Sequence, residues 1–221
     1  MEAMAHLTCV GAESEELRRF LDSLTAAGVD NVLALRGDRP ADVAPEACVH
    51  SPLLHGSDLA AFIRERHPSL GIGVAGYPET HPEAVSPQSD LDFLKLKLEV
   101  GGDFALTQLF FDNDLYFDFL RRARAIGIDK PIIPGILPVV SLKVIKRIVS
   151  LCGATLPVPL LTALEEADRS GGSAAVQEVG IDWARGQLRG LLQAGVPGVH
   201  LYTLNRDEAV LRMVEGIYQA D

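Results

Sequence analysis

Short apolar runs alternate along the chain with longer segments in which apolar residues recur at helical spacing. The apolar runs predict strands near residues 5–10, 31–35, 71–75, 104–110, 131–136 and 198–203. The periodic segments predict helices over residues 14–27, 57–66, 89–100, 115–126, 141–151 and 181–192. Such alternation is typical of an α/β fold with a parallel sheet.

One segment interrupts this rhythm. Residues 155–179 begin with two prolines, continue with a polar stretch and precede the helix expected over 181–192. We interpret the segment as an inserted helical excursion that covers the mouth of the fold or contacts a partner.

Polar residues follow several of the expected strands. They form the clusters Arg36-Gly37-Asp38, 77–84 (YPETHPEA), Gln108 and Asn205-Arg206. In a parallel β/α barrel of the TIM type, side chains at the carboxyl ends of the strands meet at one mouth and build the active site. The sequence therefore predicts a single β/α-barrel catalytic domain over residues 1–221. Six strands are expected where a closed barrel has eight, so the barrel is expected to be incomplete at its amino terminus.

Several of these residues also have a purely structural interpretation. The 77–84 loop, with its two prolines, is compatible with a plain rigid turn. Arg36 and Asp38 are compatible with a salt-bridged turn, and Asp90 and Lys97, two helical turns apart, with a solvated helix face. Gln108 carries an amide that suits a planar heterocycle. Arg206 suits a carboxylate ligand, but it also suits a helix-start ion pair with the acids that follow it.

Composition narrows the classes of partner and location. The formal charge is −10, from 30 acidic and 20 basic residues, and no block of either sign stands out. Nucleic acids and anionic membranes are therefore not expected partners. The three cysteines, Cys9, Cys48 and Cys152, are odd in number and have no CxxC spacing, which favours a reducing cytoplasm over disulfides. We expect no export signal and no membrane span.

Several common chemistries lack their sequence signals. The six histidines show no paired ligand spacing, so no metal site is expected. No glycine-rich dinucleotide or phosphate loop and no serine nucleophile elbow are present.

Six blocks of sequence, taken together, resemble the methylenetetrahydrofolate reductase family. They are residues 5–9 (AHLTC), 34–38 (ALRGD), 75–78 with 81–84 (AGYP, HPEA), 107–111 (TQLFF), 134–138 (PGILP) and 202–206 (YTLNR), in the family's order and spacing. The resemblance implies a β/α-barrel flavoenzyme of one-carbon metabolism and methionine biosynthesis. In such an enzyme FAD accepts a hydride from NADH or NADPH and passes it to 5,10-methylenetetrahydrofolate by a ping-pong mechanism, which gives 5-methyltetrahydrofolate. The resemblance is also compatible with a chain that forms a homo-oligomer.

The resemblance also implies roles for particular residues. Asp38 and Gln108 match catalytic positions: Asp38 lies beside the pyrimidine side of the flavin and helps hold the pterin, and Gln108 contacts folate and nicotinamide in alternate half-reactions. Arg206 matches a folate contact. The positions that match flavin contacts are His6, Arg36, Gly37, Gly56, Tyr77, His81, Ala84, Asp90 and Lys97.

The chain departs from the family pattern at some positions. Phe93 and Leu96 stand where some members carry polar flavin contacts, and Val144 stands where a folate-contacting glutamine occurs. The family's first strand, which carries a general-acid glutamate, has no counterpart in this sequence. Two alternatives to an active reductase therefore stay open: a non-catalytic flavin- or folate-binding module, and a partial barrel completed by another subunit.

Overall fold

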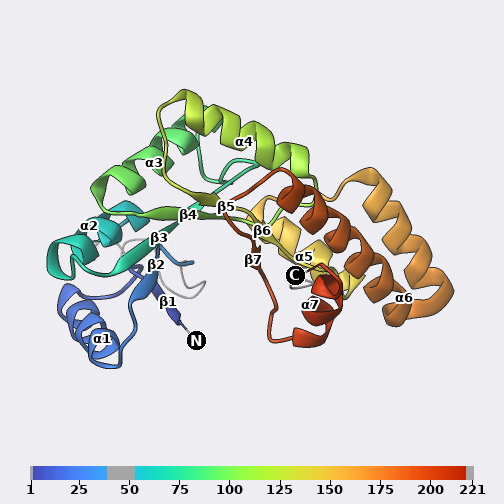
Figure 1. Ribbon diagram of the computed structural model, residues 1–221, viewed down its shortest axis with the longest axis horizontal. Helices are drawn as coiled ribbons and strands as arrows, with labels where there is room; N and C mark the ends of the chain where they lie inside the picture. Colours follow the sequence, from blue (N-terminus) through green and yellow to red (C-terminus); the bar gives the residue numbers. More distant parts are fainter. Residues whose placement is uncertain (1, 39–52, 218–221) are drawn as a thin grey trace. The chain divides into compact units, whose positions relative to one another are not determined.

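The computed structural model describes residues 2–38 and 53–217, which form two compact units (Figure 1). The first unit contains Met1–Gly76, Leu91–Leu106 and Ile126–Pro131, and the second contains Tyr77–Asp90, Thr107–Ala125 and Ile132–Asp221. The prediction of a single domain stays a prediction. No helix within the described residues combines the length and the apolar character needed to cross a bilayer.

Parallel strands form the centre of the first unit. β1 (Met4–Thr8), β2 (Asn31–Leu35), β3 (Gly71–Gly76) and β4 (Phe104–Thr107) lie in this order in one sheet. β1 and β2 run parallel with His6 opposite Leu33, and β2 and β3 run parallel with Leu33 opposite Gly73. Consecutive parallel strands joined by helices are the arrangement that the sequence predicts.

Helices bury the apolar side chains of this sheet. α1 (Ser14–Ala26) and α2 (Gly56–Arg66) connect the first three strands, and α3 (Pro87–Val100) precedes β4. Val32 on β2, Ile72 on β3 and Ile63 on α2 have no exposed surface. Burial of aliphatic side chains on both layers supplies most of the favourable free energy of folding for such a unit.

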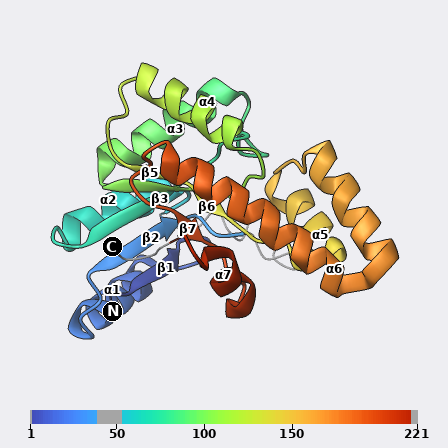
Figure 2. The same ribbon diagram turned by 45° about the vertical axis from the view of Figure 1, so that its right-hand side comes forward.

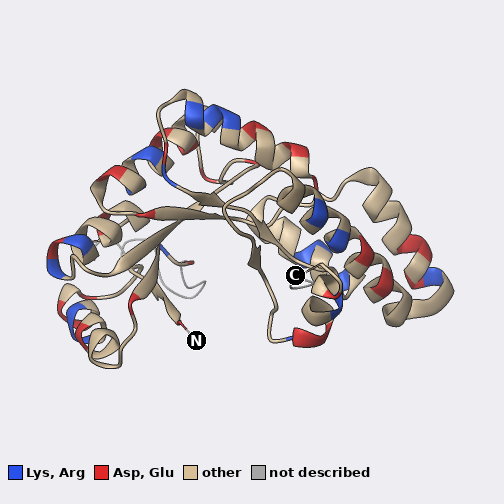
Figure 3. Ribbon diagram, viewed as in Figure 1, with Lys and Arg blue, Asp and Glu red and all other residues tan. Residues whose placement is uncertain are grey.

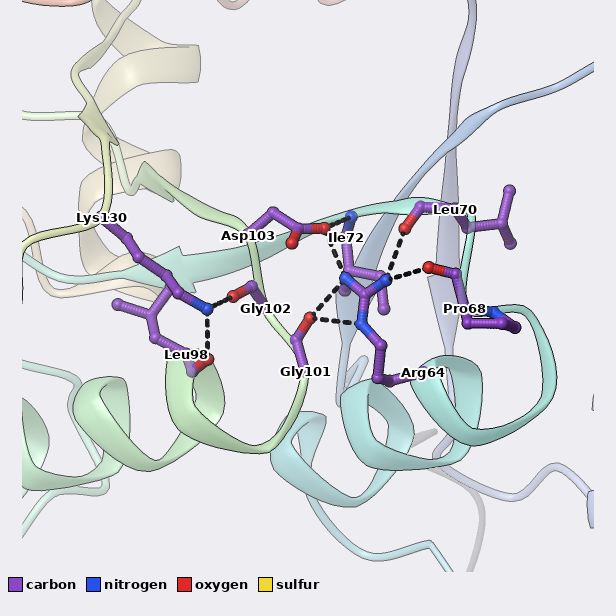
Figure 4. A network of polar contacts seen from close by, with 9 residues as sticks. All are labelled: Arg64, Pro68, Leu70, Ile72, Leu98, Gly101, Gly102, Asp103 and Lys130. Atoms are coloured by element: carbon purple, nitrogen blue, oxygen red, sulfur yellow. Dashed lines mark hydrogen bonds and ion pairs between the residues drawn. The ribbon is translucent and has the colours of Figure 1, made fainter.

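Arg64 fastens the end of α2 to the starts of β3 and β4 (Figure 4). Its guanidinium donates to the Asp103 carboxylate at 2.6 Å and to the Gly101 carbonyl at 2.8 Å. The same Asp103 oxygen accepts the Ile72 N–H at 2.8 Å. Lys130 donates to the Leu98 carbonyl at 2.8 Å in the neighbouring part of the network. These contacts lie at the amino ends of the strands, where residues of β/α folds serve stability.

The second unit contains α4 (Asn113–Ala125), β5 (Ile132–Ile133), β6 (Gly135–Ile136), α5 (Leu142–Cys152), α6 (Val158–Gln193), β7 (His200–Leu201) and α7 (Asp207–Val214). β6 and β7 pair in parallel, with Gly135 opposite His200. A Cβ at Gly135 would lie 2.5 Å from the Thr107 carbonyl oxygen, so only glycine fits at this position.

The helical excursion is confirmed. α6 consists of two helical arms joined at Gly172, where φ is 62° and ψ is −152° (Figure 2). Leu160 and Leu164 on the first arm and Val176 on the second are fully buried, in a cluster that also contains Leu137. The bend thus lets one continuous segment fold back on its own core. That it covers a mouth or contacts a partner stays a prediction.

The α/β fold class with parallel strands is confirmed, and most predicted boundaries agree within two residues. The largest difference concerns the helix predicted over 181–192, which is the end of α6 and continues without interruption from the excursion that begins at Val158. Three strands also differ. β4 ends at Thr107 instead of 110, and β7 covers only His200–Leu201. The strand expected over 131–136 is divided into β5 and β6 at Pro134, which has no N–H to donate to a ladder.

Candidate active site

In the first unit, the chain segments that leave β1 and β2 stay paired beyond the ends of the strands. The Val10 N–H donates to the Arg36 carbonyl at 2.8 Å, and the Cys9 N–H donates to the Leu35 carbonyl at 3.2 Å. Arg36 is therefore held at the carboxyl end of the sheet, as the sequence predicts.

Gly37 makes the turn after Arg36 possible. Its φ is 85°, a left-handed conformation that favours glycine. A Cβ at this position would lie 2.8 Å from the Cβ of Thr8 and 3.0 Å from Cγ1 of Val10. The turn thus packs directly on the exit of β1, and it presents Asp38 as an exposed carboxylate.

Gly56 lies in the same neighbourhood. It is the first residue of α2, and a Cβ there would lie 3.5 Å from the Ala34 carbonyl oxygen and 3.6 Å from the Arg36 nitrogen. The carboxylate of Asp58 accepts the N–H groups of Leu54 and His55, both at 2.9 Å, and so fixes the start of the helix. The structure thereby brings Gly56 together with Arg36 and Gly37.

The other predicted positions of the first unit are His6 and Lys97. His6 is exposed on β1, one residue before the buried Leu7. The Lys97 ammonium donates to the Ala75 carbonyl near the carboxyl end of β3. Cys9 is buried, and burial raises the pKa of its thiol, so it is an uncharged packing residue.

In the second unit, the loop after β3 holds an aromatic and a histidine in contact. The rings of Tyr77 and His81 meet edge to face with their centroids 4.6 Å apart. His81 Nδ1 accepts the Glu83 N–H at 3.0 Å, and the His81 N–H donates to the buried Asp90 carboxylate at 3.0 Å. The Ala84 N–H donates to the His81 carbonyl at 2.9 Å. Tyr77, His81, Ala84 and Asp90 thus form one cluster, joined by hydrogen bonds and by the ring contact of Tyr77.

Thr80 in this loop has an unusual backbone. Its φ is 76°, in the left-handed region where a β-branched residue is strained. Strain of this kind persists only where surrounding contacts hold it, and it is common at functional sites.

A hollow opens beside the loop. It is small, with a volume of about 10 Å³, which is room for about one water molecule, and it is lined by Tyr77, Pro78, Glu79, Thr80, Gln108, Leu109, Cys152 and Ala154. Two predicted site residues, Tyr77 and Gln108, therefore line the same hollow. The Gln108 amide oxygen accepts the N–H of Leu109 at 2.9 Å. The amide NH₂ of the same side chain is a donor that a ligand in the hollow could use.

Side chains that the sequence analysis missed hold the backbone around Gln108. The Tyr202 hydroxyl donates to the Thr107 carbonyl at 3.0 Å. Gln187 donates to the Phe110 carbonyl at 3.2 Å, and the Trp183 indole donates to the Phe111 carbonyl at 2.9 Å. Trp183 and Gln187 are one helical turn apart on α6, a spacing that places them on the same face. These bonds replace a sheet ladder and explain why β4 ends at Thr107.

Two ionisable groups near Gln108 stay uncharged at neutral pH. Burial raises the pKa of Tyr202 to about 12. Burial also raises the pKa of the Cys152 thiol, and the nearby Glu79 carboxylate adds to that increase. Tyr202 is therefore a hydrogen-bond donor here and not a base.

Arg206 lies after a tight turn. Leu204 and Asn205 have φ values of 48° and 59°, and the Arg206 N–H donates to the Thr203 carbonyl at 2.8 Å. Arg206 is exposed at the start of α7 and, within the described part of the chain, forms no ion pair with Asp207. It is not among the residues that line the hollow. The roles assigned to Arg206 and to the other site positions stay predictions.

Comparison with solved structures identifies the class of fold. A protein described as an uncharacterized protein from Clostridium thermocellum that binds two copies of 5-methyl-5,6,7,8-tetrahydrofolic acid aligns with a TM-score of 0.66 at 18% identity. The alignment covers 96% of this chain and 71% of that one. The fold is thus of the α/β class with parallel strands, of the β/α-barrel kind.

Sequence comparison identifies the family. The family model described as methylenetetrahydrofolate reductase matches residues 1–217. A protein of Arabidopsis thaliana named methylenetetrahydrofolate reductase (NADH) 1 is 37% identical over 221 residues. A protein of Escherichia coli (strain K12) named 5,10-methylenetetrahydrofolate reductase is 37% identical over 208 residues. The chain belongs to the methylenetetrahydrofolate reductase family.

The extent of these matches differs between the relatives. The alignments cover 96% and 94% of this chain, but 37% of the Arabidopsis protein and 67% of the Escherichia coli protein. The chain therefore spans little more than a third of the plant relative's length.

Proposed function

We propose that this chain takes part in the reduction of 5,10-methylenetetrahydrofolate to 5-methyltetrahydrofolate, with NADH or NADPH as the reductant and FAD as the carrier of the hydride. The observation that carries the proposal is the shared hollow of Tyr77 and Gln108, because the family resemblance assigns these positions to the flavin and to the two substrates. Membership of the family supports the same reaction.

The donor set of the chain fits FAD. Arg36 and Lys97 are partly buried cations, which suit an anionic pyrophosphate. Gly37 keeps the turn at the exit of β2 compact, since a side chain there would overlap Thr8. When bound, FAD supplies a centre that accepts a hydride from the nicotinamide and delivers it to the folate.

The proposed roles follow the nature of each side chain. His6, Arg36, Gly37, Gly56, Tyr77, His81, Ala84, Asp90 and Lys97 are proposed flavin-binding residues. The exposed carboxylate of Asp38 is proposed to tune flavin reduction by its charge and to orient the pterin. Gln108 is proposed to orient folate and nicotinamide through its amide, and Arg206 to bind a folate carboxylate with its guanidinium.

A cytoplasmic location is part of the proposal. Cys152 is a free thiol, and an unpaired cysteine is typical of a reducing compartment. Cys48 lies outside the described residues.

The experiment that tests this function compares the chain with its Gln108→Leu variant, which keeps the size of the side chain and removes the amide. The variant is expected to bind FAD as the parent does and to lose about 10²-fold in the rate of 5-methyltetrahydrofolate formation, because positioning and polar stabilisation are lost together. Product is measured by mass spectrometry with NADH and NADPH in separate reactions. A parent chain that binds FAD and forms no product would instead identify a flavin-binding module.

A further inference from the structure

The loop that carries Tyr77 and His81 is tied to a distant segment of the second unit. The Glu79 carboxylate accepts the Thr155 N–H with both oxygens, at 3.0 and 3.1 Å. These residues are 76 positions apart in the sequence. The bond therefore joins the loop after β3 to the chain that leaves α5.

A second contact reinforces the same junction. Gly153 ends α5 in a left-handed conformation with φ of 74°. A Cβ at Gly153 would lie 2.9 Å from Cγ of Pro82, so the absence of a side chain lets the end of the helix pack against the loop. The two segments meet at Glu79 and at Pro82.

We propose that Glu79 is a positioning residue, which holds the 77–84 loop in the conformation that presents Tyr77 and His81. The step from loop conformation to flavin binding rests on the proposed function. The tie, by which we mean the hydrogen bond between the Glu79 carboxylate and the Thr155 N–H, does not depend on it.

Thr80, the residue next to Glu79, has a strained backbone. A left-handed β-branched residue returns to a relaxed conformation unless other contacts hold it. Within the loop, the Thr80 N–H donates only a long bond of 3.2 Å to the Tyr77 carbonyl. A carboxylate that accepts a backbone N–H is a stronger, charge-assisted contact, and Glu79 supplies it.

The tie also shapes the hollow. Glu79 and Thr80 line one part of it, and Cys152 and Ala154, which flank Gly153, line another. Since Thr155 follows Ala154 directly, the bond from Glu79 to Thr155 fixes these two parts of the lining to each other. Loss of the bond would let the loop move away from the end of α5 and take Tyr77 with it.

The test compares three variants with the parent chain. Glu79→Ala removes both acceptors, and Glu79→Gln keeps one acceptor without the charge. Glu166→Ala is the control, because Glu166 is an exposed acid of the same unit, on α6, and the substitution changes the net charge equally. Amide hydrogen exchange is measured at Thr155 and His81, together with the unfolding midpoint and the dissociation constant for FAD.

The expected results separate positioning from overall stability. In Glu79→Ala, exchange at Thr155 and at His81 accelerates at least about tenfold, because a hydrogen bond to a charged group is lost. Glu79→Gln restores part of the protection at both amides, and Glu166→Ala exchanges as the parent does. The dissociation constant for FAD rises about tenfold in Glu79→Ala and less in Glu79→Gln. The variants therefore rank in the same order by dissociation constant and by exchange rate, whereas their unfolding midpoints do not follow this order.

Three outcomes would overturn the proposal. Unchanged exchange at Thr155 in Glu79→Ala would show that the tie is absent, and faster exchange at Thr155 with an unchanged rate at His81 would show that it does not hold the loop. An unchanged dissociation constant despite faster exchange at both amides would show that the loop conformation has no effect on flavin binding. A parent chain that binds no FAD would contradict the proposed function, while the exchange rates would still decide whether Glu79 holds the loop.

Discussion

Tyr202 links the paired strands β6 and β7 to the segment that carries Gln108. Its N–H donates to the Ile136 carbonyl at 2.9 Å, and its hydroxyl donates to the Thr107 carbonyl at 3.0 Å. The ring meets His200 edge to face at 4.6 Å. One side chain thus supports the exit of β4 through a bond that requires a neutral phenol.

This arrangement predicts a pH dependence. The fold raises the pKa of Tyr202 to about 12, above the value of about 10 in an unfolded chain. Between these values the folded state keeps a proton that the unfolded state has lost, so stability is fully present below about pH 10 and falls as pH rises toward 12. Unfolding by urea at several alkaline pH values measures this loss, and Tyr202→Phe is expected to show a shallower decline. A decline of equal steepness in parent and variant would contradict the assignment to Tyr202.

The close approach of Gly37 to Thr8 predicts the effect of a substitution. Gly37→Ala places a Cβ 2.8 Å from Thr8 in a left-handed conformation, whereas Gly28→Ala meets the same conformation with no atom within 4 Å. The control is expected to cost about 1–2 kcal/mol for the backbone alone. Gly37→Ala is expected to cost about 1–3 kcal/mol more, because the overlap adds to the strain. Equal losses in urea unfolding would show that the turn relaxes away from Thr8.

The residues of the turn after β2 were predictable from the sequence, whereas the residues that support the backbone around Gln108 were not. Arg36, Gly37 and Asp38 were predictable as a polar turn because they follow an apolar run directly. The supports of Gln108 were not, since Trp183 and Gln187 reach their carbonyl partners over 72 and 77 positions of sequence. Bonds from a side chain to a distant backbone carbonyl leave no periodic or local signal.

Glycines allow the backbones of neighbouring elements of the second unit to approach each other closely. α6 passes so near the segment before α5 that a Cβ at Gly180 would lie 1.9 Å from the Val139 carbonyl oxygen. Gly186, on the same helix, is exposed and has no atom within 4 Å of such a Cβ.

The two glycines of α6 therefore predict opposite effects of the same substitution. Gly180→Ala is expected to destabilise the chain by about 1–3 kcal/mol, because the backbone of one of the two segments must move. Gly186→Ala is expected to stabilise it by about 0.5–1 kcal/mol through helix propensity. The free energies of unfolding in urea measure both, and a Gly180→Ala variant as stable as the parent would show that α6 does not approach Val139 so closely.

Helices and strands with strong periodicity were predictable from local pattern, and their observed bounds agree closely. The excursion over 155–179 was predictable as helical, but the bend at Gly172 was not. Two consecutive glycines permit many backbone conformations, so their sequence alone does not specify the bend. The division of one predicted strand into β5 and β6 could have been found from Pro134, which interrupts the ladder.

Charged residues are distributed over the described parts of both units. Acidic and basic residues are interspersed along the helices of each unit, and neither sign forms a continuous stripe on the described residues (Figure 3). The net charge is −10. An anionic cofactor and an anionic folate therefore depend on individual cations, for which Arg36, Lys97 and Arg206 are the proposed residues.

The family was predictable from sequence because six motifs occur in the family's order, each within a strand or directly after one. The hollow was not, because its lining combines the loop after β3, the exit of β4 and the residues after α5. Such a combination depends on tertiary packing, which no single motif encodes.

The proposed reduction of methylenetetrahydrofolate consists of two half-reactions at the flavin, and each of them can be followed separately. The chain is loaded with FAD, reduced anaerobically with NADH or NADPH, and mixed with 5,10-methylenetetrahydrofolate while the flavin absorbance is recorded. We expect the absorbance to disappear with the nicotinamide and to return with the folate, with 5-methyltetrahydrofolate formed in proportion. A chain that binds FAD but is neither reduced by a nicotinamide nor reoxidised by the folate would contradict this expectation.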